Sequence, residues 1–260
     1  MKSGVKLLID AGNTRLKWCW VDGDDIPLEP DACEYEVFES DGVDVFITDG
    51  QEADEVLVCN VAGQDFEQEL TTAFAYWDIR PRFVRSQVRQ GEVINAYENP
   101  QDLGVDRWMA LLGAWMQNKD AACIVDCGSA VTIDVLDDSG RHLGGLIVPG
   151  LEMMQNALLD GTSLTLDGKS QSRKSTSLLA SDTVSAIEAG SIYAVVALID
   201  RIRQDSEEAL GRELPLLISG GDVDLIQPLL DGECSYEPLL IFHGMMVADG
   251  NHRPLKQSGR

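Results

Sequence analysis

The chain has 260 residues, which is enough for one large domain or two medium-sized ones with a sizeable core. Its 44 acidic residues outnumber its 20 basic residues, and a formal net charge of −24 repels phosphate backbones and anionic lipids. We therefore expect no nucleic acid and no membrane among its partners.

Targeting and cysteine signals agree with this expectation. The apolar run before Asp10 is too short for a signal sequence, and no apolar stretch reaches the roughly 18 residues of a membrane span. The six cysteines are scattered, and Cys123 and Cys127 lack the second pair of ligands that a zinc site requires. These features predict a soluble cytoplasmic protein with reduced thiols.

The first half of the chain alternates strands and helices. The segment LLIDAGNTRLKWCWVDG, which begins at Leu7, predicts a strand, an acidic turn with glycine and a second strand. A strand at 56–62, a helix at 64–77 and a helix from Asp106 to Met116 follow.

The second half begins with a copy of the first hairpin. The segment CIVDCGSAVTIDVLDDSG aligns with the first one without gaps, and Asp126 falls on Asp10. Two such units more than one hundred residues apart predict an α/β fold of two duplicated domains, at 1–117 and 118–260. We expect both turns to face a central cleft between the domains, where ligands commonly bind.

Further elements complete the second half. A strand with its turn at 144–150 and a short helix at 151–159 precede a long helix from Thr183, with Asp182 or Thr183 as its N-cap. The segment 214–230 predicts a strand, a Gly-Gly turn and a helix. The segment 160–177, rich in Ser, Thr, Gly and Lys, predicts a mobile loop.

The first hairpin turn has the residues that an anion site needs. Gly12 permits a sharp bend, so that successive N–H groups can surround a phosphate that Lys17 reaches. Asp10 cannot bind phosphate directly, but its carboxylate suits a Mg²⁺ ion that bridges phosphate oxygens. Alone, the motif is more typical of an ordinary hairpin in which Asp10 caps its own turn. The repeat of the motif at Asp126 favours a nucleotide site.

A third turn, Ser219 to Asp222, lies between a strand and a helix, where glycines let a ligand approach the backbone. The alternative is a tight connection without a ligand. Neither G-x-G-x-x-G nor G-x-x-x-x-G-K-[ST] occurs in the sequence, which disfavours dinucleotide-binding and P-loop enzymes. The three turns together resemble the superfamily of sugar kinases, actin and heat-shock ATPases, whose duplicated ribonuclease H-like domains bind ATP.

The segment NPQDLGVDRWMALLGA carries the candidate catalytic base. Asp106 precedes an apolar helix, Gly104 permits close backbone approach, and Arg107 can hold an anionic group. A carboxylate that accepts the proton of a hydroxyl group is what phosphoryl transfer to an alcohol requires. The alternative is a helix N-cap Asp followed by a surface Arg.

The order of these motifs resembles type III pantothenate kinases over nearly the whole chain. The motifs are the D-x-G-N-T start, Tyr97 with L-G-x-D-R, D-x-G-[ST]-A, G-G-x-I-x-P-G and the helix start at Asp182-Thr183. The resemblance implies ATP-dependent phosphorylation of pantothenate to 4'-phosphopantothenate, the first step of coenzyme A biosynthesis. Ser129 stands where the family usually has Thr, and serine keeps the hydroxyl group.

The resemblance also implies a role for each matching residue. Asp106 would be the general base, and Asp126 would bind a monovalent cation, K⁺ or NH₄⁺, while Mg²⁺ accompanies ATP. The ATP-binding residues would be Asp10, Ala11, Gly12, Asn13, Thr14, Arg15, Leu16, Lys17 and Ser129. The pantothenate-binding residues would be Tyr97, Gly104, Val105, Asp106, Arg107 and Thr183.

Family members form homodimers with the long helix at the interface, and small residues at Ala186, Ala189, Gly190 and Ala194 permit close helix contact. Packing within one subunit is the alternative. Two other functions stay open at this point: a kinase for another small hydroxy acid, and a regulatory relative without catalysis. His142, His243 and His252 show no partner in the sequence, and we expect none of them in the mechanism.

Overall fold

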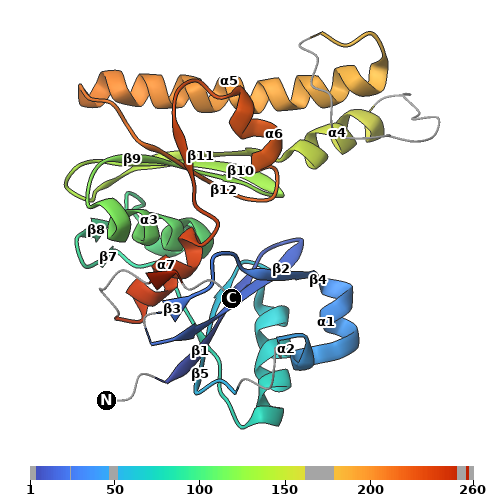
Figure 1. Ribbon diagram of the computed structural model, residues 1–260, viewed down its shortest axis with the longest axis vertical. Coiled ribbons are helices and arrows are strands. Elements are labelled where there is room, and N and C mark those ends of the chain that lie inside the picture. The colour runs from blue at the N-terminus through green and yellow to red at the C-terminus, as the bar shows by residue number, and fades with distance from the viewer. Residues whose placement is uncertain (1–3, 24, 47–51, 162–178, 251–255, 258–260) are drawn as a thin grey trace. The chain divides into compact units, whose positions relative to one another are not determined.

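The computed structural model describes residues 4–23, 25–46, 52–161, 179–250 and 256–257 (Figure 1). The predicted loop at 160–177 lies outside them except for its first two residues, and so does His252. The chain groups into two compact units. The first contains the described residues up to 121, together with 136–144 and those from 237 on, and the second contains 122–135 and 145–236.

The first unit is built on a mixed sheet with the strand order β14-β3-β2-β1-β5-β6, in which β4 also pairs with β2. Strand β1 is antiparallel to β2 and parallel to β5. The strands of this unit are β1 (Val5–Ala11), β2 (Arg15–Asp22), β3 (Asp25–Ile26), β4 (Asp31–Glu34), β5 (Glu55–Asn60), β6 (Arg82–Phe83), β7 (Arg89–Gln90), β8 (Val93–Ile94) and β14 (Lys256–Gln257). Its helices are α1 (Tyr35–Asp41), α2 (Gln64–Phe74), α3 (Val105–Asn118) and α7 (Leu240–Ala248), with 3₁₀ turns at Gly42–Phe46, Ala75–Trp77 and Pro100–Asp102.

Alternation along β1 and β2 assigns the two faces of this sheet. One face carries Leu7, Ile9 and Trp18, which pack with the aromatic side chains of α1 and α2 in one apolar core. Helices α1 and α2 accordingly lie along these strands in Figure 1. The residues that alternate with them along each strand, including Asp10, lie on the opposite face.

Helices α3 and α7 pack against each other through two glycines. A Cβ on Gly113 would lie 2.1 Å from the carbonyl oxygen of Leu240, and one on Gly244 would lie 1.8 Å from that of Met109. The two backbones are therefore in direct contact, as only glycine allows at these positions. Helix α7, which also contacts β1, is almost entirely buried. This packing fixes α3, whose first turn carries Asp106, against α7.

The second sheet has the order β11-β10-β9-β12-β13, and β12 is parallel to both β9 and β13. The series β3-β2-β1-β5-β6 of the first sheet repeats this order, as the duplicated ribonuclease H-like fold predicts. The strands are β9 (Ala122–Cys127), β10 (Ala130–Leu136), β11 (His142–Pro149), β12 (Leu216–Ser219) and β13 (Cys234–Tyr236). The helices are α4 (Leu151–Asp160), α5 (Thr183–Leu210) and α6 (Val223–Ile226), with a 3₁₀ turn at Gln227–Leu229.

Helix α5 runs across the second sheet with α4 beside its N-terminal half (Figure 1). Its N-cap is Asp182, whose side chain accepts a hydrogen bond from Ser185 N at 2.9 Å, and it ends at Gly211 with φ 67°. Among the described residues, α5 is the one helix long and apolar enough to cross a membrane by length and composition. A third of its most apolar window, 33%, is buried inside the protein, and the core helix of a soluble protein passes the same test.

Candidate active site

The first hairpin turn joins β1 to β2 as predicted. Ala11 pairs with Leu16, and Gly12 N donates to Arg15 O at 3.1 Å, which leaves the side chains of Asn13, Thr14 and Arg15 exposed. Ala11 and Leu16 are buried in the core beneath the turn. They therefore offer a ligand only their backbone.

Tyr35, the first residue of α1, supports this turn. Its hydroxyl group donates to Gly12 O. Burial, followed by the negative charge of Asp10, raises the pKa of the Tyr35 hydroxyl, so it stays a donor at neutral pH. No sequence motif marks Tyr35, because the contact spans 23 residues between a turn and a helix.

Asp10 lies at the end of β1, only 6% exposed, between Lys17 on β2 and Cys59 on β5. Directly opposed residues share a sheet face, so Lys17 lies on the same face of the sheet as Asp10. The Cys59 thiol is hydrogen-bonded to Asp10. Burial, followed by the charges of Asp10 and Asp106, raises the pKa of Cys59 well above its ordinary value.

Two carboxylates thus act on one buried thiol. Asp10 comes from the sheet and Asp106 from the start of α3, and the positive charge of Arg85 acts on Cys59 in the opposite direction. The thiol stays neutral and adds no third negative charge beside the two carboxylates. The sequence did not single out Cys59 or Arg85, because strand register places Cys59 beside Asp10 and Arg85 lies in the loop after β6.

Buried polar side chains hold the segment that leads to Asp106. Ser86 Oγ donates to Leu103 O at 2.8 Å, and Asn95 Oδ1 accepts from Tyr97 N at 2.9 Å. Ser86 is 3% exposed and Asn95 8% exposed. Buried groups satisfied in this way fix a loop conformation.

Asp106, Arg107 and Tyr97 form a cluster at the start of α3. Asp106 is partly exposed and accepts from Arg107 N at 2.8 Å, while Arg107 is 5% exposed. Arg107 Nη1 donates to the Tyr97 hydroxyl group at 3.1 Å. The N-cap is Gly104 rather than Asp106, so the alternative of a capping Asp followed by a surface Arg is wrong. A buried guanidinium next to a partly exposed carboxylate is typical of a binding site.

The second hairpin turn joins β9 to β10. Gly128 N donates to Ala130 O at 3.1 Å, and Ser219 Oγ, from the end of β12, donates to Asp126 Oδ1 at 2.7 Å. The third turn therefore meets the second one at Asp126. Burial, followed by the charges of Asp126 and Asp222, raises the pKa of Cys127, which keeps its thiol neutral.

Two glycines pack directly on this second turn. A Cβ on Gly150 would lie 2.3 Å from Gly128 O, and one on Gly220, which has φ +107°, would lie 2.2 Å from Cys127 O. Gly150 N also donates to Ser129 O at 3.0 Å. The motifs that contain Gly128, Gly150 and Gly220 thus meet at the backbone of the second turn.

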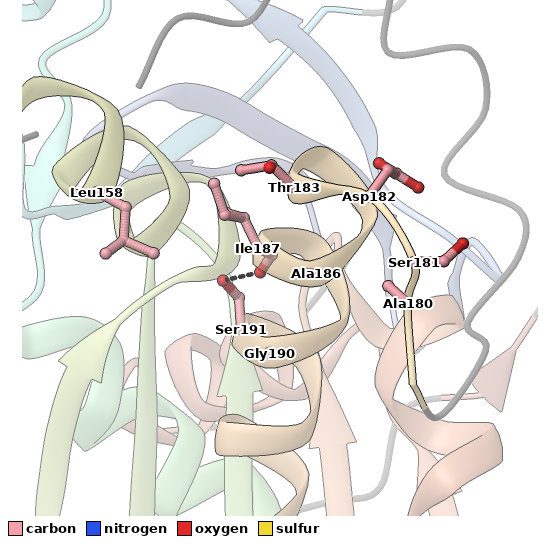
Figure 2. Close-up of a pocket in the computed structure, with 9 residues that line it drawn as sticks. All are labelled: Leu158, Ala180, Ser181, Asp182, Thr183, Ala186, Ile187, Gly190 and Ser191. Atoms are coloured by element: carbon pink, nitrogen blue, oxygen red, sulfur yellow. Dashed lines mark hydrogen bonds between the residues drawn. The ribbon is translucent and has the colours of Figure 1, made fainter. Parts of the chain in front are cut away.

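Thr183 lies in the second unit, beside a pocket of about 550 Å³ between α4 and the start of α5 (Figure 2). The pocket is lined by Leu158, Ala180, Ser181, Asp182, Thr183, Ala186, Ile187, Gly190 and Ser191. Ser191 Oγ donates to Ile187 O at 2.9 Å. The acceptor cluster of Tyr97, Asp106 and Arg107 belongs to the first unit, and the pantothenate-binding role of Thr183 stays a prediction.

Solved structures share this fold at low identity. The ethanolamine utilization protein EutJ from Carboxydothermus hydrogenoformans matches with a TM-score of 0.53 and 12% identity, covering 94% of this chain and 89% of that one. Component A of the (R)-2-hydroxyglutaryl-CoA dehydratase from Acidaminococcus fermentans matches with a TM-score of 0.51 and 14% identity, covering 95% and 96%. The repeated sheet order and these matches show that the chain has the fold of the actin-like ATPases.

Sequence comparison assigns the family within this class. The family model described as type III pantothenate kinase matches residues 6–205. The type III pantothenate kinase of Nitrosococcus oceani is 37% identical over 254 residues, covering 92% of this chain and 91% of the relative. That of Idiomarina loihiensis is 35% identical over 273 residues, covering 94% and 98%. The chain belongs to the type III pantothenate kinase family, and it is an ATP-dependent kinase that phosphorylates pantothenate in coenzyme A biosynthesis.

Proposed function

We propose that Asp106 is the general base of the pantothenate kinase reaction. The observation that supports this role is the position of Asp106 at the start of α3, where it is partly exposed and lies next to the buried Arg107. The charge of Asp106 also acts on the thiol of Cys59, which is hydrogen-bonded to Asp10. Asp106 takes the proton of the pantothenate hydroxyl group. At the same time, the oxygen of that hydroxyl group forms a bond to the γ-phosphorus of ATP. The bond from that phosphorus to the bridging oxygen breaks, and ADP leaves.

ATP would bind along the two hairpin turns. The backbone and the exposed side chains of Asn13 and Thr14 would contact the phosphates from the first turn, with Lys17 as a positive charge. Ser129 offers its hydroxyl group from the second turn. The buried carboxylate of Asp10 fits a Mg²⁺ ion, because carboxylate oxygen is the ligand that Mg²⁺ prefers. The bound ion would neutralise phosphate charge during transfer.

Asp126 would bind the monovalent cation, K⁺ or NH₄⁺. Its carboxylate, the Ser219 hydroxyl group and nearby carbonyl groups of the turn are all oxygen donors, which suits a hard cation. The negative charges of Asp126 and Asp222 both act on Cys127, so a cation would also offset repulsion here. A cation bound at Asp126 would let a chain of net charge −24 accept two anionic substrates.

Pantothenate would be held by Arg107 through its carboxylate and by Tyr97, with Gly104 and Val105 forming the wall beside Asp106. Buried guanidinium groups bind carboxylates strongly because solvent does not screen them. Thr183 would contribute from α5, in the manner the family resemblance implies.

We also propose a cytoplasmic homodimer that uses α5. Ala186, Gly190 and Ala194 are exposed at intervals of four residues along one face of α5, whereas Ala189 is buried within the unit. Small residues at this spacing let two helices approach closely. An Ala194→Arg exchange should convert the dimer to a monomer in analytical ultracentrifugation. A wild-type chain that sediments as a monomer at micromolar concentration would contradict the dimer.

The kinase assay tests the site assignments. Purified protein is incubated with Mg-ATP and pantothenate in K⁺ buffer and in Na⁺ buffer, and product is measured for wild type, Asp106→Asn and Asp126→Asn. We expect wild-type turnover to require K⁺ or NH₄⁺, and Asp106→Asn to lower kcat by at least about 10²-fold without changing the melting temperature. Turnover of Asp106→Asn within threefold of wild type would remove Asp106 from the base role. Activity in Na⁺ equal to that in K⁺ would remove the cation role of Asp126.

A further inference from the structure

We propose that His142 is a positioning residue of the acceptor site, which acts by holding the ring of Tyr97. The inference rests on the proposed roles of Tyr97 and Arg107 in pantothenate binding. It departs from the sequence-based expectation that no histidine takes part in the mechanism.

The His142 ring is stacked on the ring of Tyr97. Their centroids are 6.2 Å apart and their planes differ by 9°. His142 is 1% exposed, whereas Tyr97 is partly exposed. A buried ring parallel to a partly exposed one restricts the rotation of the exposed ring.

Arg107 contacts the same tyrosine. Its guanidinium carbon lies 5.9 Å from the centroid of the Tyr97 ring, and Nη1 donates to the Tyr97 hydroxyl group at 3.1 Å. The row His142, Tyr97, Arg107 therefore connects a buried imidazole to the guanidinium proposed to hold the pantothenate carboxylate. Movement of the Tyr97 ring would release one hydrogen bond that orients this guanidinium.

The segment that carries His142 is itself fixed. It follows a tight turn at 137–141, in which Asp137 Oδ1 accepts from Arg141 N at 2.9 Å. Ile94 N donates to Gly140 O at 3.0 Å, and a Cβ on Gly140 would lie 2.9 Å from Glu92 O. The turn thus packs tightly against the β8 region, and Asn95 in the same region holds the backbone of Tyr97. His142 is rigid enough to position a partner.

The competing explanation is that His142 only fills the core. The pair His142→Leu and His142→Phe separates the two roles, because both side chains fill the space but only phenylalanine offers a flat ring. We expect His142→Leu to raise KM for pantothenate about 3- to 10-fold, with kcat and KM for ATP within twofold of wild type. His142→Phe should stay within twofold for all three constants. Equal effects of Leu and Phe on KM for pantothenate would overturn the stacking role.

His243→Leu is the matched control, since His243 is 6% exposed in α7 of the same unit and belongs to no part of the proposed site. We expect it to change the melting temperature but not KM for pantothenate. A rise in that KM as large as the one in His142→Leu would overturn the proposal, because loss of any buried histidine would then suffice.

A double variant shows whether His142 acts through Tyr97. When Tyr97→Ala is already present, adding His142→Leu should not raise KM for pantothenate any further. A full additional increase would overturn the proposal. If Tyr97→Ala itself leaves KM for pantothenate unchanged, the proposed acceptor site fails, and the inference fails with it. If Tyr97→Ala raises that KM and His142→Leu does not, only the inference about His142 fails.

Discussion

A methyl group on Gly104 would lie 2.6 Å from Oδ1 of Asp106, which is closer than any real contact of a Cβ atom. The atom in the way is the end of a side chain and not a backbone group. The backbone at Gly104, with φ −49° and ψ 134°, is open to any residue. An alanine at this position would therefore shift the carboxylate of Asp106 without straining the backbone.

Gly104→Ala should accordingly lower kcat about 10-fold or more while the protein stays folded, because a displaced base loses part of its contribution. Steady-state kinetics and a melting curve check this. The double variant Gly104→Ala, Asp106→Asn is the control. If Gly104 acts only through the carboxylate, the double variant should be no slower than Asp106→Asn. A multiplicative loss would show that Gly104 matters for another reason.

Gly220 and Gly221 offer a matched pair in the third turn. Gly220 has φ +107° and no room for a Cβ beside the backbone of Cys127, whereas nothing lies within 4 Å of a Cβ on Gly221. Gly220→Ala should lower the melting temperature and raise KM for ATP, because the Asp126 turn must shift. Gly221→Ala should leave the melting temperature unchanged. Equal melting temperatures for the two variants would contradict the close approach.

Tyr35→Phe removes the hydroxyl group that donates to Gly12 O. A neutral hydrogen bond contributes about 1 kcal/mol, so we expect KM for ATP to rise about 3- to 5-fold as the first phosphate turn loosens. KM for pantothenate should not change. Tyr76→Phe is the control, since Tyr76 is 89% exposed. Identical ATP kinetics for the two variants would show that the bond does not order the turn.

His243 makes the stability depend on pH. Burial lowers its pKa in the folded protein from 6.5 to about 4, so the unfolded chain binds a proton at higher pH than the folded chain does. Its contribution to the free energy of unfolding is complete above about pH 6.5 and is lost as the pH falls toward 4, by up to about 1.4 kcal/mol per pH unit.

Urea unfolding of wild type and His243→Leu between pH 7 and pH 4 checks this. Other acidic groups contribute equally to both proteins, so the difference between the two curves isolates His243. We expect wild type to lose stability more steeply than the variant. Parallel curves would mean that His243 has the same pKa in the folded and the unfolded protein.

The sequence supplied more of the fold than of the contacts in the site. Strand β5, helix α3 and helix α5 lie where periodicity and capping residues predict them, with Asp182 as the N-cap of α5. Helix α7 was not predicted, because the segment LIFHGMMVA is apolar on nearly every side and too short to show a period. Helix α1 and the two-residue strands β6 to β8 were missed because such short elements form through tertiary pairing.

The sequence by itself determined the two acidic turns, the order of the motifs and the residue types that the chemistry needs. Glycine and aspartate specify such turns through local backbone geometry, which depends on neighbours in the chain. The tertiary structure alone decided three contacts. Cys59 is hydrogen-bonded to Asp10, Tyr35 donates a hydrogen bond to Gly12, and the ring of His142 stacks on that of Tyr97. These pairs are 23 to 49 residues apart, and strand register and helix packing bring them together. No local propensity encodes a contact of that kind.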